Sequence, residues 1–132
     1  MGLAEQMLRE VAFAEGGREL GPAAVTLERC REYIEDHLSD PGLSPVRVAE
    51  ANFISTRYLH LLFEQAETTV AAYIRTRRLD RIQEALADPQ LAHVPVEALA
   101  RRFGFENTSY FGQVFKRDTG LTPARYRAEA LA

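Results

Sequence analysis

The chain has 132 residues, 46% of them hydrophobic, and a formal net charge of −3. This length fits one compact domain, or two very small ones that share a scaffold. No apolar run reaches the roughly 18 residues of a membrane span, and the N-terminus lacks the continuous apolar stretch of a signal peptide. Cys30 is the single cysteine, which excludes an internal disulfide and favours a reducing, cytoplasmic environment.

Positive charge is concentrated in the second part of the chain. Residues 1–42 hold four arginines and nine acids, a balance of −5, whereas residues 43–127 hold twelve basic residues and nine acids, a balance of +3. Because this surplus is weak, any contact with phosphate groups would depend on where individual basic side chains stand.

Apolar residues recur at helical spacing along the whole chain, and no segment alternates with the period of a strand. The sequence therefore predicts an all-α fold of about seven helices. A first helix is expected over residues 3–14, before the glycine and proline breakers of residues 16–22. A second is expected over residues 25–38, with an apolar face made of Leu27, Cys30, Ile34 and Leu38.

The next segment predicts a helix-turn-helix. Ser44 is a suitable N-cap for a short helix that ends near Asn52, and Ser55 is a suitable N-cap for a second helix that ends near Ala66. Two short helices joined by a turn of about four residues form this motif. Where the two helices cross, Ala49 is small enough to let the backbones approach.

A long linker helix is expected over residues 69–87, roughly 28 Å in length. Major-groove faces of B-DNA repeat every ~34 Å, so such a helix could hold two reading helices about one DNA turn apart. Its apolar face is expected to hold Val70, Tyr73, Ile74, the stem of Arg77, Ile82, Ala85 and Leu86. Its arginines are expected to form a solvated face with Asp80 and Glu84 as ion-pair partners, namely Arg75, Arg77, Arg78 and Arg81.

A second helix-turn-helix repeats the first. The phrase "YLHLLFE" at Tyr58 returns as "YFGQVFK" at Tyr110, 52 positions later, with Ala100 at the helix crossing and one extra residue in the turn. Gly104 takes the place of Phe53. Glycine adopts left-handed backbone at little cost, whereas Phe53 would need other dihedral angles or carry strain. The expected core positions of the two reading helices are Tyr58, Leu59, Leu62, Phe63, Tyr110, Phe111, Val114 and Phe115.

The segment "ALARRFGFENTSYFGQVFKRDTGLTPARYR" at residues 98–127 closely resembles the C-terminal signature of AraC/XylS-type transcription regulators. The resemblance extends back to about residue 27 and covers roughly a hundred residues. The signature is A-x(3)-G-F-x(3)-S-Y-F-x(3)-F-K-x(3)-G-x-T-P-x(2)-Y-R, matched here by Ala100, Gly104, Phe105, Ser109, Tyr110, Phe111, Phe115, Lys116, Gly120, Thr122, Pro123, Tyr126 and Arg127.

This resemblance implies a bipartite DNA-binding domain over residues 25–132. Its first helix-turn-helix unit would span residues 25–68 and its second residues 90–132. It would bind specific double-stranded promoter DNA in adjacent major grooves and regulate transcription. Residues 1–24 resemble the tail of a linker that follows an N-terminal effector or dimerisation domain, so the chain is either a fragment or a compact regulator without such a domain.

The candidate DNA-contacting residues lie on the second helix of each unit, because the N-terminal part of that helix faces base edges. The resemblance points to the same places. Arg57 suits guanine and Gln113 suits adenine. The expected base-contacting residues are Thr56, Arg57, His60 and Leu61 in the first unit, and Thr108, Ser109, Gly112 and Gln113 in the second. The expected phosphate-contacting residues are Ser55, Asn107 and Lys116.

The sequence offers little support for an enzyme, a metal site or a cofactor. His37, His60 and His93 lack metal-ligand spacing, and Cys30 lies on an amphipathic face, like a small hydrophobic residue. No membrane partner is expected. The isolated domain is expected to be a monomer, and a longer protein could dimerise through an N-terminal domain. RNA polymerase is a further candidate partner. The main alternative is a helical protein-interaction module that contacts RNA polymerase and has little DNA affinity.

Overall fold

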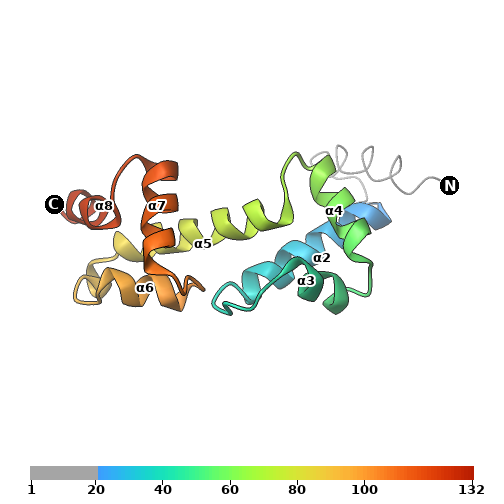
Figure 1. Cartoon of the computed structure of the whole chain (residues 1–132), viewed down its shortest axis with the longest axis horizontal. Helices are drawn as coiled ribbons and strands as arrows, with labels where there is room; N and C mark the ends of the chain where they lie inside the picture. The colour runs from blue at the N-terminus through green and yellow to red at the C-terminus, as the bar shows by residue number, and fades with distance from the viewer. Residues whose placement is uncertain (1–20) are drawn as a thin grey trace. The chain divides into compact units, whose positions relative to one another are not determined.

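The computed structural model describes residues 21–132, and within this range it is all-helical, as predicted (Figure 1). The helix expected over residues 3–14 lies outside the described residues. The described part holds seven α-helices and one short 3-10 helix, which are α2 (Pro22–Asp36), α3 (Pro45–Ala51), α4 (Thr56–Gln65), α5 (Val70–Leu86), η1 (Pro89–Leu91), α6 (Val96–Arg102), α7 (Thr108–Thr119) and α8 (Pro123–Ala130).

The described chain forms two compact units. Unit 1 holds residues 21–36 and 43–73, and unit 2 holds residues 37–42 and 74–132. The loop between α2 and α3 therefore belongs to unit 2, although both of these helices belong to unit 1. Helix α5 begins in unit 1 and continues in unit 2.

Unit 1 contains the first helix-turn-helix, formed by α3 and α4. The Ser44 hydroxyl accepts a hydrogen bond from the Arg47 amide at 3.3 Å, and the Ser55 hydroxyl accepts one from the Tyr58 amide at 3.0 Å. Both predicted N-caps are confirmed, and each satisfies an amide that a helix start leaves unpaired. Ala49 is 2% exposed, as the tight helix crossing requires. The largest fully buried side chains of this unit are Ile34, Val48, Leu59, Leu62, Phe63 and Val70.

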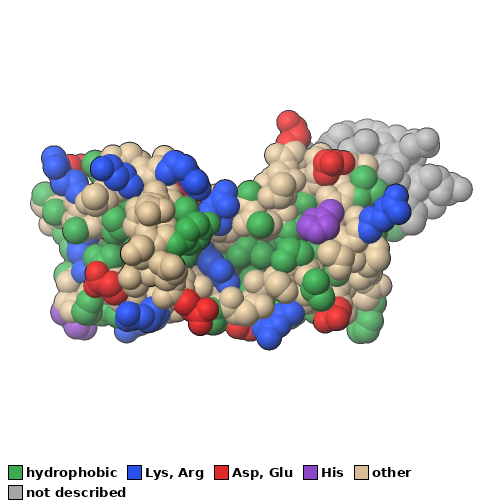
Figure 2. Space-filling view, viewed as in Figure 1, with side chains coloured by type: hydrophobic (Ala, Val, Ile, Leu, Met, Phe, Trp, Pro, Cys, Tyr) green, Lys and Arg blue, Asp and Glu red, His purple; other side chains and the backbone are tan. Residues whose placement is uncertain are grey.

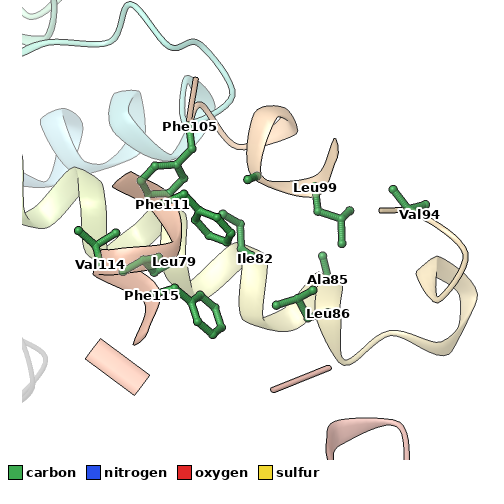
Figure 3. Close-up of a cluster of buried hydrophobic side chains, with 11 residues drawn as sticks. Leu79, Ile82, Ala85, Leu86, Val94, Leu99, Phe105, Phe111, Val114 and Phe115 are labelled. Atoms are coloured by element: carbon green, nitrogen blue, oxygen red, sulfur yellow. The ribbon is translucent and has the colours of Figure 1, made fainter. Parts of the chain in front are cut away.

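Unit 2 contains the second helix-turn-helix, formed by α6 and α7, followed by α8. The Asn107 side chain caps α7 by accepting from the Tyr110 amide at 2.9 Å. Figure 3 shows Phe111 and Phe115 of α7 pointing toward the α5 side chains Leu79 and Ile82. The buried cluster consists of Leu79, Ile82, Ala85, Leu86, Val94, Leu99, Ala100, Phe105, Phe111, Val114 and Phe115.

Left-handed backbone occurs at matching places in the two units, at the helix-turn-helix turn and after the reading helix. Unit 2 has glycine at both places, with φ of +90° at Gly104 and +83° at Gly120. Unit 1 has Phe53 at φ +58° and Glu67 at φ +64° instead. Residues with a Cβ adopt this region at a cost, so the first turn does carry strain, one of the two predicted possibilities. Phe53 is also 95% exposed.

Two of the eight predicted core residues are not in the core. Tyr110 is 47% exposed and Tyr58 is half-buried, whereas the other six are buried. Helical geometry explains the error, because the inward row of α7 passes through Phe111, Val114 and Phe115 and leaves Tyr110 at its edge. The Tyr110 ring lies against Phe105, with centroids 6.3 Å apart.

Helix α5 has 17 residues, slightly fewer than predicted, and is about 25 Å long. Its predicted apolar face omitted Leu79, which is 2% exposed. The predicted ion pairs are confirmed, with Arg77 at 2.9 Å from Asp80 and Arg81 at 3.6 Å from Glu84.

The prediction that Arg78 belongs to a solvated face is wrong. Arg78 is half-buried, and its guanidinium donates hydrogen bonds to the backbone carbonyl oxygens of Leu38 at 3.0 Å and Asp40 at 2.7 Å. Burial lowers the pKa of Arg78, and the nearby Asp40 opposes this shift. Arg78 therefore holds the residue 37–42 loop within unit 2.

Candidate nucleic-acid interface

The predicted reading residues of unit 1 lie on the outer face of α4. Arg57 and His60 are exposed, Leu61 is 41% exposed and Thr56 is half-buried. Arg57, His60 and Leu61 line a shallow hollow of about 420 Å³ together with Ser55, Tyr58 and Glu64. This face offers a guanidinium, an imidazole and an aliphatic side chain, which can donate to base acceptors and contact a methyl group.

The predicted reading residues of unit 2 lie on the outer face of α7. Ser109 and Gln113 are exposed, and Thr108 and Gly112 are half-buried. Lys116 is exposed one turn beyond Gly112. Thr108 and Gly112 line a second hollow, of about 280 Å³, whose other lining residues are Val96, Glu97, Phe111, Thr122, Pro123 and Ala124. Sequence reasoning missed the contribution of α6 and α8 to this surface, because it considered only the reading helix.

The two capping residues keep hydrogen-bonding capacity for a ligand. Asn107 uses its side-chain oxygen in the cap, which leaves its two amide protons to donate. Ser55 uses its hydroxyl as an acceptor, which leaves the hydroxyl proton to donate. Both residues are exposed at the start of a reading helix. Each can therefore donate a hydrogen bond to a phosphate oxygen.

Arg57 and Lys116 differ from the basic residues that form ion pairs on other faces of the described helices. Neither forms an ion pair with another described residue, whereas Arg77, Arg117 and Arg125 pair with carboxylates at 2.9–3.2 Å. In the space-filling view, Lys and Arg side chains gather over α7 and α8, and a histidine lies over α4 (Figure 2). Arg57 and Lys116 thus carry charge that no described carboxylate neutralises.

Gly104 and Arg78 support the start of the second reading helix. A Cβ built on Gly104 would lie 2.6 Å from the Leu38 carbonyl oxygen and 2.6 Å from the Arg78 guanidinium carbon. Real Cβ atoms do not approach so closely, so the turn before α7 packs against this loop only because residue 104 is glycine. Its left-handed φ favours glycine as well.

No cluster of histidine, cysteine or acidic side chains suited to a metal ion occurs among residues 21–132. Cys30 is fully buried on α2, and burial raises its pKa to about 11. At neutral pH the thiol is therefore protonated and packs as a small apolar group, as the sequence predicts. None of the helices in the described part is both long and apolar enough to cross a membrane.

Two helix-turn-helix units with capped, exposed reading helices define a DNA-binding class of protein, and comparison with known proteins specifies it. Residues 48–129 match the family described as "Helix-turn-helix domain". The chain is 32% identical over 106 residues to multiple antibiotic resistance protein MarA of Escherichia coli, covering 79% of this chain and 80% of that protein. The chain belongs to the AraC/XylS-type family of helix-turn-helix transcription regulators.

Longer relatives and solved structures agree with this placement. The arabinose operon regulatory protein of Escherichia coli is 31% identical over 102 residues, which are 76% of this chain. The chain spans only 34% of the length of that relative. The C-terminal domain of AraT, a response regulator from Geobacillus stearothermophilus, superposes with a TM-score of 0.71 at 28% identity, covering 79% of this chain and 84% of that domain. Family membership supports sequence-specific DNA binding and transcription regulation for the matched region.

Proposed function

We propose that one chain binds a specific double-stranded promoter site by placing α4 and α7 in successive major grooves, and thereby regulates transcription. The observation that carries this proposal is that the helix-turn-helix unit with its reading helix occurs twice in one chain. Both units present a capped reading helix with exposed polar side chains on its outer face, Arg57 and His60 in unit 1 and Ser109 and Gln113 in unit 2, and the two helices lie 52 residues apart in sequence. Because the chain has both reading helices, it needs no second copy to cover two half-sites, and we propose that the isolated domain acts as a monomer.

The two reading helices carry different chemistry. In unit 1, the planar fork of the exposed Arg57 would bond guanine O6 and N7, and Thr56, His60 and Leu61 would complete the reading row. In unit 2, the exposed Gln113 would bond adenine N6 and N7, beside Thr108, Ser109 and Gly112.

Phosphate contacts would orient both helices on the duplex. Ser55 and Asn107 stand at the N-termini of α4 and α7, where a donor meets the DNA backbone. Lys116 lies farther along α7, where the helix passes the sugar-phosphate strand. These contacts supply affinity without sequence information, and they make binding depend on salt.

One observation supports a second candidate function, a protein-interaction module that contacts RNA polymerase. Phe53 is 95% exposed although its φ is +58°, so an apolar side chain stands in solvent at a strained position. Strained backbone clusters at functional sites, and an exposed aromatic ring can anchor a protein partner. A module of this kind would have little DNA affinity of its own, and binding measured on promoter fragments separates the two candidates.

The experiment is competition binding on a selected site and its single-base variants, at several salt concentrations. Arg57→Ala and Gln113→Ala should each cost about 1–3 kcal/mol on the best site and relax the preferred base at one position. The two variants should affect different half-sites. Lys116→Ala should weaken all sequences alike and lower the salt slope by about 1.

Arg29→Ala is the matched control for Arg57→Ala, because Arg29 is an exposed arginine of unit 1 on α2 rather than on the reading helix. This control should leave base preference unchanged. If Arg57→Ala and Gln113→Ala lose affinity uniformly, with base preference intact, the proposed reading face is wrong.

A further inference from the structure

Gly112 is a glycine that the fold does not require. It lies in the interior of α7, where glycine is roughly 1 kcal/mol less favourable than alanine. Its φ is not among the left-handed glycine values, and a Cβ built on it would meet nothing within 4 Å. Gly104, by contrast, is favoured by its left-handed φ and required by its close neighbours. Contacts and backbone conformation within the folded chain therefore do not explain why residue 112 is glycine, and a bound partner would explain it.

Gly112 stands at the edge of the 280 Å³ hollow on the outer face of unit 2. The hollow opens between the starts of α6, α7 and α8. Its lining combines polar atoms with methyl and methylene groups, and its uncharged members are Val96, Thr108, Phe111, Gly112, Thr122, Pro123 and Ala124. Glu97 is the charged side chain of the lining. A carboxylate repels phosphate, so the hollow suits the apolar edge of a base rather than the DNA backbone.

We propose that this hollow receives the C5-methyl group of a thymine in the half-site read by α7, and that Gly112 is the specificity-determining residue that admits it. The inference rests on the proposed function, since it names a base for the same surface. In the major groove only thymine presents a methyl group, and alanine, threonine and phenylalanine are the side chains that contact it. Gly112 has no side chain to hold the base edge away from Thr108 and Phe111.

The equivalent position of unit 1, 52 residues earlier, is His60, which is exposed and polar. The hollow beside it is lined by Arg57 and Glu64 as well as by Leu61. The two units therefore select different bases at equivalent places. One chain reads an asymmetric site, in which the half facing α7 contains a thymine that the half facing α4 does not need.

The test removes single methyl groups from the DNA. A site is first selected from random duplexes with the intact chain, and each thymine is then replaced by deoxyuridine, which lacks only the methyl group. The affinities of the unmodified chain, of Gly112→Ala and of Gly120→Ala are measured by competition. Gly120→Ala is the matched control, because it makes the same change in unit 2 at a residue that neither lines the hollow nor belongs to the reading row.

One thymine in the half-site of unit 2 should be sensitive. Its replacement should weaken binding by the unmodified chain about 3- to 10-fold, the scale of one buried methyl group. Gly112→Ala should bind the thymine site more weakly by a similar factor and should no longer distinguish thymine from deoxyuridine there. It should also unfold at higher urea concentration, because alanine is the better helix former. Weaker binding by a more stable protein excludes misfolding as the cause. Gly120→Ala should keep the sensitivity to deoxyuridine.

The proposal is overturned if the unmodified chain binds every deoxyuridine site as tightly as the thymine site. It is also overturned if Gly112→Ala keeps the same sensitivity, or if the selected half-site has no thymine facing α7. These outcomes leave specific binding intact. Failure of the proposed function gives a different result, because no preferred site then emerges from the random duplexes.

Discussion

Unit 2 has two glycines with left-handed backbone, Gly104 and Gly120, but only Gly104 also lacks space for a Cβ. Replacing each of them by alanine therefore separates the conformational cost from the steric cost. Both residues have left-handed φ, +90° and +83°, and this backbone costs a residue with a Cβ about 1–2 kcal/mol. Around Gly120 a Cβ would meet nothing within 4 Å. Gly120→Ala should therefore lower the free energy of unfolding only by this conformational cost. At Gly104 the Cβ would lie 2.6 Å from the Leu38 carbonyl oxygen and the Arg78 guanidinium.

Gly104→Ala should therefore displace Arg78 or the loop that it holds. Arg78 donates to the carbonyl oxygens of Leu38 and Asp40, and a hydrogen bond to a charged group contributes about 1.5–3 kcal/mol. Loss of one such bond, added to the conformational cost, gives a total loss of about 2.5–5 kcal/mol in the free energy of unfolding. The two variants should thus differ by at least about 1.5 kcal/mol.

Urea unfolding followed by circular dichroism measures this difference, and both glycines lie in unit 2, so they report on the same part of the chain. A third measurement repeats Gly104→Ala in a chain that also carries Arg78→Ala. There the decrease in the free energy of unfolding caused by Gly104→Ala should be smaller, because the guanidinium that would collide with the new Cβ is absent. Equal losses for Gly104→Ala and Gly120→Ala would refute the reasoning, since the close approach to Arg78 and Leu38 would then contribute nothing.

Three further variants or treatments test the packing. Phe115→Ala should lower the free energy of unfolding by about 3–5 kcal/mol, because Phe115 is fully buried against Phe111 and Tyr126, and a loss below about 1 kcal/mol would contradict its place in the core. Phe53→Gly should raise that free energy by about 0.5–1 kcal/mol by relieving left-handed strain, and no gain would mean that the turn is unstrained. Because burial raises the Cys30 pKa to about 11, a disulfide reagent at pH 8 should label Cys30 only after urea is added, and rapid labelling of the folded protein would contradict its burial.

Local signals in the sequence were sufficient to predict the helix-turn-helix units. Ser44, Ser55 and Asn107 mark helix starts because their side chains bond nearby amides, and this chemistry acts within three residues. The repeat also located the two crossing alanines and the extra residue in the second turn. Such features depend on neighbouring residues, so the sequence alone reveals them.

Features that depend on distant parts of the chain were not predicted. In the sequence Arg78 looks like the other arginines of α5, and its role emerges only when the fold brings the residue 37–42 loop to it, 38–40 positions away in sequence. Likewise, the repeat placed Tyr110 on the reading helix, but only tertiary packing shows that it lies at the edge of the core.

The candidate site was predicted in part. Helical geometry placed the outer rows of α4 and α7 away from the core, because the apolar spacing of a helix also fixes its opposite face. Thr56, Thr108 and Gly112 are nevertheless half-buried. The hollow beside Gly112 could not be anticipated, since α6 and α8 supply much of its lining from outside the reading helix.

The central claim is that one chain reads two half-sites, and footprinting of a selected site at measured stoichiometry tests it most directly. Successive major-groove faces lie about 10 base pairs apart, so one bound chain should protect two stretches with this centre-to-centre separation. Arg57→Ala should weaken protection of one stretch and Gln113→Ala of the other. A single protected stretch per chain, with the second appearing only when a second chain binds, would contradict the account.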